Sequence, residues 1–120
     1  MPTALVVDDA LFMRTTISNM LEQWGFEVIG QAVNGKQAVV MFEELKPDIV
    51  TMDLTMPVMS GLEAVKEIMP KHPDAKIIMI TALGQQRIIV EAIESGAKDF
   101  ITKPFTAFQL KAVLDNIFEQ

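Results

Sequence analysis

Five residues placed at the ends of apolar runs are the ones in this sequence best suited to chemistry. Asp8 and Asp9 follow the run "TALVV", and Asp53 closes the run "DIVTMD". Thr81 closes "KIIMIT", and Lys103 follows "DFIT". A charge that leaves water is costly unless another group pairs with it. We therefore expect these side chains to lie close together and to pair with one another in a single site.

The chemistry that these residue types could support is phosphoryl transfer. Three neighbouring carboxylates repel one another, so either their pKa values rise or a cation neutralises them. The chain has no cysteine and one histidine, which is far from these acids in the sequence, so an all-oxygen site for Mg²⁺ is expected, with Mn²⁺ as an alternative. A lysine ammonium and a threonine hydroxyl suit phosphoryl oxygens, and Asp53 could attack phosphorus to form an aspartyl phosphate.

The segments that would position these residues alternate between apolar and amphipathic patterns. The expected strands cover residues 3–7, 27–32, 48–52, 76–80 and 99–102. Strict alternation of strands and helices predicts an α/β fold, a (βα)₅ parallel sheet with helices on both faces. Ligands of such sheets bind at the carboxyl ends of the strands, where the five candidate residues stand.

Local signals mark several helix ends. Short polar residues followed three positions later by Glu or Gln predict capping boxes. The pairs are Asn34 with Gln37, Ser60 with Glu63, and Thr106 with Gln109. Gly25 and Gly96 stand where the first and fourth helices should end. No repeat, low-complexity tract or linker interrupts the chain, so we expect one domain over residues 1–120.

The composition argues against several classes of protein. The net charge of −6 disfavours non-specific binding to nucleic acid or to an anionic membrane, because both need a basic face. No apolar run approaches the roughly 18–20 residues of a membrane span. The first residues also lack the basic start of a secretory signal. We expect a cytoplasmic, monomeric protein.

Four stretches together closely resemble the receiver domain of two-component response regulators. They are "LVVDDALFMR", "PDIVTMDLTMPVMSGLE", "IIMITA" and "GAKDFITKPF". The resemblance covers essentially the whole chain. Within the family, the chain is most similar to stand-alone chemotaxis regulators from outside the enteric bacteria. It implies a doubly wound, flavodoxin-like sheet in the order 2-1-3-4-5, which would bring the candidate residues into one shallow cleft.

The resemblance also implies a role for each acidic position. Asp53 would accept phosphate from a histidine kinase. Asp9, Asp53 and the backbone carbonyl of Thr55 would ligate Mg²⁺, and Asp8 would act mainly through water. Taken alone, Asp8 and Asp9 could instead cap the first helix, whose N-terminal dipole favours acids.

A second group of positions is implied to form the switch. Lys103 would contact the phosphoryl group, and the bond from Lys103 to Pro104 would be cis. Thr81 would move toward the phosphate, and Phe100 would turn inward behind it. Such a pair is a two-state element biased by a local change of charge.

The function implied is a phosphorylation-dependent binding switch that catalyses only its own phosphorylation and dephosphorylation. Its partner would be a flagellar or archaellar motor component, or a phosphatase. A single-domain phosphorelay carrier, or the receiver part of a longer transcriptional regulator, would use the same site. A dehalogenase-type phosphatase is disfavoured because Thr55 stands where that family has a second acid.

Three further expectations concern the lifetime of the phosphoryl group, a partner surface and the single histidine. Thr55 and Leu83 flank the expected place of a hydrolytic water, and neither can orient it, so we expect slow self-dephosphorylation. Ile88, Val90, Phe100 and Phe108 are predicted to form an exposed apolar patch that binds a partner, with ordinary packing as the alternative. His72 lies in a turn, and we expect it to be solvated.

Overall fold

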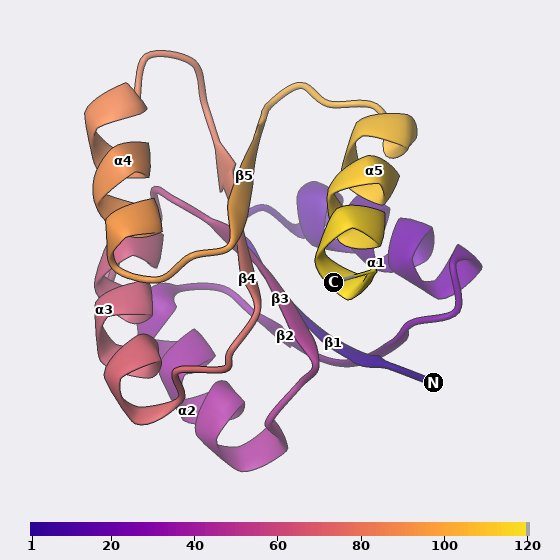
Figure 1. Ribbon diagram of the computed structural model, residues 1–120, viewed down its shortest axis with the longest axis horizontal. Helices are drawn as coiled ribbons and strands as arrows, with labels where there is room; N and C mark the ends of the chain where they lie inside the picture. Colours follow the sequence, from indigo (N-terminus) through magenta and orange to yellow (C-terminus); the bar gives the residue numbers. More distant parts are fainter. Residues whose placement is uncertain (120) are drawn as a thin grey trace.

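A five-stranded parallel sheet in the order β2-β1-β3-β4-β5 forms the centre of the computed structural model, which describes residues 1–119 (Figure 1). The strands are β1 (Thr3–Val7), β2 (Glu27–Ala32), β3 (Ile49–Asp53), β4 (Ile77–Thr81) and β5 (Asp99–Thr102). The helices are α1 (Leu11–Gln23), α2 (Gly35–Leu45), α3 (Gly61–Lys71), α4 (Gln86–Glu94) and α5 (Ala107–Phe118). The predicted (βα)₅ architecture and the strand order are both confirmed.

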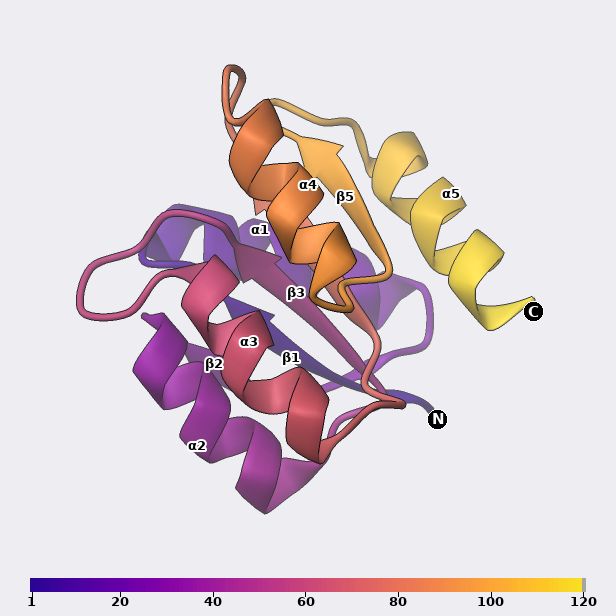
Figure 2. The same ribbon diagram turned by 60° about the vertical axis from the view of Figure 1, so that its left-hand side comes forward.

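The helices divide into two layers. Helices α1 and α5 cover one face of the sheet, and α2, α3 and α4 cover the other (Figures 1 and 2). This division follows from right-handed crossovers, because the chain runs outward from β1 to β2 and then returns past β1 to β3. None of the helices within residues 1–119 is long and apolar enough to cross a membrane.

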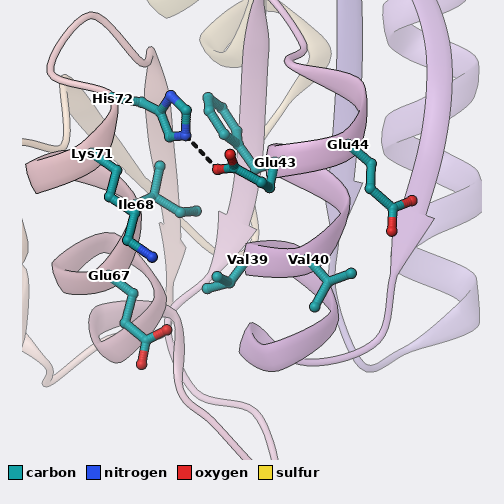
Figure 3. A pocket seen from close by; sticks show the side chains of 9 residues that line it. Val39, Val40, Glu43, Glu44, Glu67, Ile68, Lys71 and His72 are labelled. Carbon is teal, nitrogen blue, oxygen red and sulfur yellow. Dashed lines mark hydrogen bonds and ion pairs between the residues drawn. The ribbon is translucent and has the colours of Figure 1, made fainter.

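The contact between α2 and α3 corrects the expectation that His72 is solvated. Its Nε2 lies 2.6 Å from Oε2 of Glu43, and its ring centroid is 5.0 Å from that of Phe42 (Figure 3). The hydrogen bond to His72 lowers the pKa of Glu43. A groove of about 280 Å³ runs along this contact, lined by Val39 and Ile68 among others. The turn after α3 directs His72 back onto α2, which local sequence does not reveal.

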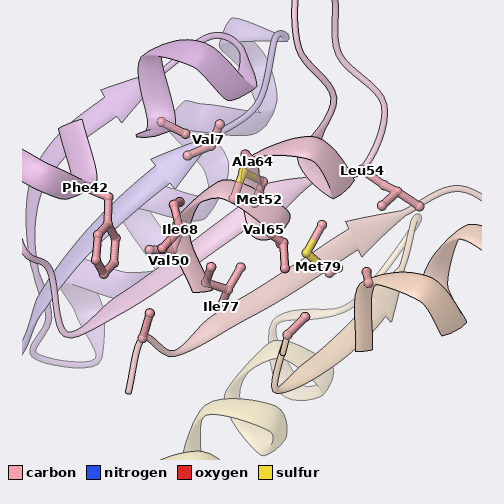
Figure 4. Packing of buried hydrophobic residues seen from close by; sticks show 14 of the residues in the cluster. Val7, Phe42, Val50, Met52, Leu54, Ala64, Val65, Ile68, Ile77 and Met79 are labelled. Atoms are coloured by element: carbon pink, nitrogen blue, oxygen red, sulfur yellow. The ribbon is translucent and has the colours of Figure 1, made fainter. Parts of the chain in front are cut away.

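Alternation along the strands produces two separate cores. On the side of α2, α3 and α4, Val50, Met52, Ile77 and Met79 are fully buried and pack together (Figure 4). Their neighbours in sequence point to the other face, where Ile49, Ile78 and Ile80 pack against α1 and α5. Each such side chain contributes about 1.5–3 kcal/mol to folding by leaving water. The near-continuous apolar runs therefore reflect a sheet covered on both faces.

Two strands end one residue later than expected. β3 runs to Asp53 and β4 to Thr81, because Asp53 pairs with Ile80 and Thr81 pairs with Thr102 in the parallel ladder. Asp53 and Thr81 are thus the last paired residues of their strands rather than the first residues of loops. Their backbones are held by the sheet while their side chains reach its edge.

The helix ends agree with the sequence signals, with one exception. Ser60 and Thr106 form complete capping boxes with Glu63 and Gln109. Asn34 accepts a hydrogen bond from the backbone N–H of Gln37, but the Gln37 side chain accepts from Val33 rather than from Asn34. Gly25 and Gly96 have φ values of +90° and +120°, so both occupy the left-handed region expected at helix ends.

Candidate functional site

The edge formed by the carboxyl ends of β1, β3, β4 and β5 collects all five candidate residues. The backbone N–H of Asp8 donates to Ala32 of β2, and that of Lys103 donates to Thr81 of β4. These bonds extend the ladder by one residue beyond β1 and β5. The positions of the side chains are therefore set by backbone pairing, and not by the loops alone.

Three carboxylates form the acidic part of this site. Asp8, Asp9 and Asp53 each offer one oxygen, and these oxygens all lie within 4.8 Å of one another. Asp8 is fully buried, Asp53 is 8% exposed, and Asp9 is open to solvent. The sequence-based expectation that these acids share one place is thus met by their geometry.

Asp8 is held by contacts that explain how a fully buried acid is tolerated. Its Oδ1 accepts the backbone N–H of Ala10 at 2.9 Å, and its Oδ2 accepts from Nζ of Lys103 at 3.1 Å. Its backbone carbonyl accepts a hydrogen bond from the Arg14 guanidinium at 2.8 Å. The capping alternative is wrong, because Ala10 is the N-cap residue and no described side chain caps α1. Sequence reasoning assigned no role to Arg14, which lies one helical turn beyond Ala10.

Lys103 is the positive partner of the cluster. Its Nζ lies 3.1 Å from Asp8 Oδ2 and 3.5 Å from Asp53 Oδ1. Burial is the largest influence on its pKa and lowers it, but the hydrogen bond to Asp8 and the charge of Asp53 outweigh burial, so the pKa of Lys103 is raised. The peptide bond from Lys103 to Pro104 is cis. Lys103 therefore stays protonated and aimed between two acids.

Asp53 has the perturbed acidity expected of a reactive group in a crowded acidic site. Burial raises its pKa to about 6, repulsion from Asp8 and Asp9 acts in the same direction, and Lys103 opposes them. One ammonium does not balance three carboxylates. The surplus negative charge and the all-oxygen donor set fit a hard divalent cation such as Mg²⁺, so the residues present suit the metal that the sequence suggested.

The loop after β3 is held against the site by a glycine. A Cβ on Gly61 would lie 2.2 Å from the backbone oxygen of Asp53, so only glycine permits this approach. The N–H of Gly61 donates to the carbonyl of Leu54 at 2.9 Å. The N-terminus of α3 thus supports the backbone that carries Asp53. Thr55, next in this loop, is exposed, as is Leu83 after β4.

Thr81 is buried, and its hydroxyl has a partner that the sequence did not indicate. It donates to the side-chain oxygen of Gln85 at 2.9 Å, with the carbonyl of Ala82 as a longer alternative at 3.2 Å. Gln85 also donates to the hydroxyl of Thr55 at 2.7 Å. The only sequence signal was the polar pair "QQ" four residues after Thr81, which resembles an ordinary helix start.

The four residues predicted to form an apolar patch are each exposed in the structure. The exposed fractions are 39% for Ile88, 53% for Val90, 43% for Phe100 and 81% for Phe108. Ordinary packing does not account for these side chains, because Ile89, between Ile88 and Val90, is the buried residue of that run. A small cavity of about 120 Å³ is lined by both Phe100 and Thr81.

Comparisons with known proteins agree with this geometry. Residues 4–115 match the family described as the response regulator receiver domain. The chain is 55% identical to the chemotaxis protein CheY of Listeria monocytogenes, covering 92% of this chain and 93% of that protein. It is 52% identical to CheY of Thermotoga maritima, covering 94% of each chain.

A solved structure shows the same likeness in three dimensions. The CheX–CheY complex of Borrelia burgdorferi, solved with BeF₃ and magnesium, contains a chain that superimposes with a TM-score of 0.92 at 33% identity. The match covers 97% of this chain and 88% of that one. The expected likeness to receiver domains of chemotaxis regulators is confirmed.

Proposed function

Because this chain belongs to the response regulator receiver domain family, we propose that it is a signalling switch that accepts a phosphoryl group on Asp53 and thereby changes its affinity for another protein. The phosphodonor would be a phosphorylated histidine of a kinase. The reaction would be Mg²⁺-dependent. Apart from its own phosphorylation and dephosphorylation, the protein would catalyse nothing.

One observation carries this proposal: Asp53 ends a buried strand with Lys103 3.5 Å away and two further carboxylates beside it. A structural ion pair would need one acid for one lysine. Here a cluster of three acids has one lysine, which contacts two of them, and Asp53 has a raised pKa. Perturbed groups clustered at a strand edge are typical of a reactive site.

The acids define which residues would hold the metal. Asp9 and Asp53 would ligate it with the backbone carbonyl of Thr55, and Asp8 would act mainly through water. When bound, the ion would supply positive charge near the transferring phosphoryl group. A cation at this site would also favour the ionised form of Asp53, because its charge would oppose the burial and the repulsion from Asp8 and Asp9 that raise the pKa.

The proposed transfer uses Asp53 as the nucleophile and Lys103 as a positive contact for the phosphoryl group. A carboxylate oxygen of Asp53 forms a bond to phosphorus while the bond from phosphorus to the donor's histidine nitrogen breaks, and the electron pair of that bond returns to the imidazole. Lys103 is placed to contact a phosphoryl oxygen, since its Nζ already lies near Asp53. The product is an aspartyl phosphate, whose phosphoryl group of about two negative charges replaces the single charge of the carboxylate, so the edge of the sheet gains about one negative charge.

This added charge would then move the switch. The hydroxyl of Thr81 would turn to donate to the phosphoryl group, and Phe100 would move from its half-exposed position into the cavity behind Thr81. Ile88, Val90 and Phe108 are exposed as well, and we propose that they form a partner-binding surface together with Phe100. Burial of Phe100 would therefore change the proposed partner-binding surface.

The relatives favour chemotaxis over the other receiver roles. Both of the relatives described above are chemotaxis proteins, and the Borrelia burgdorferi relative was solved in complex with CheX. We therefore propose a chemotaxis partner such as a motor component or a phosphatase, in preference to a phosphorelay carrier or the receiver of a transcriptional regulator. Because kinases take phosphate from nucleotides inside the cell, we place the protein in the cytoplasm.

The proposal is tested by transfer from a phosphohistidine donor. We expect label to move from a histidine kinase to this protein only when Mg²⁺ is present, and to be released by hydroxylamine, which cleaves acyl phosphates. Label that resists hydroxylamine would indicate a phosphoester on serine or threonine and would contradict the proposal. Asp74→Asn, at an exposed acid remote from the site in the sequence, is the matched control and should accept label normally.

A further inference from the structure

Gln85 links the two loops that border the acidic site. Its side-chain oxygen accepts from the Thr81 hydroxyl at 2.9 Å and from the backbone N–H of Ala82 at 3.0 Å. Its side-chain nitrogen donates to the Thr55 hydroxyl at 2.7 Å. The amide thus uses both of its ends at once, one toward the loop after β4 and the other toward the loop after β3.

This arrangement is specific to an amide at this position. The oxygen must accept twice on one side, and the nitrogen must donate on the other, so neither a carboxylate nor an ammonium could make the same set of bonds. Gln85 is only partly buried, and it immediately precedes α4. Its side chain makes no cap for that helix, so its hydrogen bonds serve the two loops.

A hydroxyl has a single proton, and this limits what Thr81 can do. While that proton is donated to Gln85, it cannot be donated to a phosphoryl oxygen on Asp53. We propose that Gln85 is a positioning residue that holds Thr81 in the resting state and must release it when Asp53 is phosphorylated. This inference rests on the proposed function and deepens it, because it names a residue that affects the equilibrium between the resting and active states.

The latch formed by Gln85, Thr81 and Thr55 has a direct energetic consequence. Hydrogen bonds made only in the resting state stabilise that state relative to the active one. The net contribution of one hydrogen bond, about 0.5–1.5 kcal/mol, corresponds to roughly a two- to thirteenfold change in the equilibrium between the resting and active states. Loss of the latch therefore shifts the population toward the active state. By reciprocity, it also increases the affinity for a group that binds the active state.

The test compares Gln85→Met with Gln86→Met in the full chain. Methionine keeps the length of the side chain but removes its hydrogen bonds. Gln86 is the adjacent, exposed glutamine and serves as the matched control. Beryllofluoride with Mg²⁺ is the probe, as a stable substitute for a phosphoryl group, and its equilibrium affinity is measured by calorimetry. We expect about a three- to tenfold tighter Kd for Gln85→Met, and an unchanged Kd for Gln86→Met.

A second readout needs neither metal nor phosphoryl analogue. In metal-free protein, the methyl resonance of Thr81 and the ring resonances of Phe100 should shift in Gln85→Met toward the positions seen in the wild type with beryllofluoride. If Gln85 has a purely structural role, Gln85→Met would lower the midpoint of urea unfolding, but these resonances would not shift toward their positions in the beryllofluoride-bound wild type. Thr55→Val removes one end of the latch only, and it should produce a smaller shift in the same direction.

The outcomes separate this inference from the proposed function. If the wild type does not bind beryllofluoride, the assignment of Asp53 as acceptor is wrong. If the wild type binds it but Gln85→Met binds equally or more weakly, with resting resonances, then the latch is refuted and the acceptor assignment stands.

Discussion

Replacing Asp53 with asparagine should make the metal-free protein more stable at neutral pH. The buried carboxylate has its pKa raised from 3.8 to about 6, so its ionised form is less favourable in the folded state than in the unfolded chain. Two pKa units correspond to about 3 kcal/mol at most. Because the carboxylate reaches solvent and is screened there, we expect a gain of about 1–3 kcal/mol in the free energy of unfolding.

The pH dependence of this gain follows from the direction of the pKa shift. Between pH 3.8 and about 6, the folded protein holds a proton on Asp53 that the unfolded chain has lost. The destabilisation by Asp53 therefore develops as pH rises through this window and is complete near neutrality. The difference shrinks as pH falls toward 3.8 and is mostly gone about one unit below it, where Asp53 is protonated in both states and the asparagine variant should lose most of its advantage.

The assay is urea unfolding in EDTA across this pH range, followed by the fluorescence of Trp24, which packs against the core on the α1 and α5 side. Asp74→Asn, at an exposed acid, is the control for removing any negative charge. Added Mg²⁺ should stabilise the wild type and narrow the difference. A gain that does not change with pH, or a loss of stability at neutral pH, would refute the argument that ionised Asp53 is strained by burial and by its acidic neighbours.

Three further outcomes are expected. Thr55→Asn with Leu83→Glu should speed loss of phosphate from Asp53, because each adds a polar group that can orient water, and unchanged decay of the phosphorylated protein would contradict this. Thr51→Val should raise the free energy of unfolding by about 1 kcal/mol in urea titrations, since within residues 1–119 the buried Thr51 hydroxyl has no hydrogen-bond partner; a loss of stability would show that the hydroxyl is satisfied. Gly61→Ala should destabilise by about 1–3 kcal/mol or more, because its Cβ meets the backbone of Asp53 at 2.2 Å, and near-wild-type stability would show that the loop yields.

Much of the fold could be predicted because its signals are local or periodic. Apolar runs predicted the five strands, and the caps Ser60 and Thr106 predicted two helix starts to the residue. The strand ends at Asp53 and Thr81 were expected one residue early, since the end of a parallel strand depends on its partner's register. The Gln37 side chain was assigned the wrong donor for a similar reason: the backbone N–H groups of Val33 and Asn34 are adjacent, and Gln37 accepts from Val33.

The site was predictable in its residues and less so in its contacts. Asp8, Asp53 and Lys103 can be recognised in the sequence because they are charged residues at the ends of apolar strands. Gln85 does not, because a glutamine near a helix start is common and its partners lie in two other segments of the chain. His72 was misjudged in the same way, since its contact with Glu43 depends on how two helices pack. Long-range pairs between ordinary polar residues leave no pattern in the sequence.

The most direct test of the central claim is the intact mass of the protein after incubation with acetyl phosphate. We predict a single phosphoryl adduct on the wild type in the presence of Mg²⁺, and its loss when EDTA replaces the metal. The adduct should also be absent from Asp53→Asn under both conditions. An adduct that survives Asp53→Asn would contradict the assignment of Asp53 as the phosphoryl acceptor.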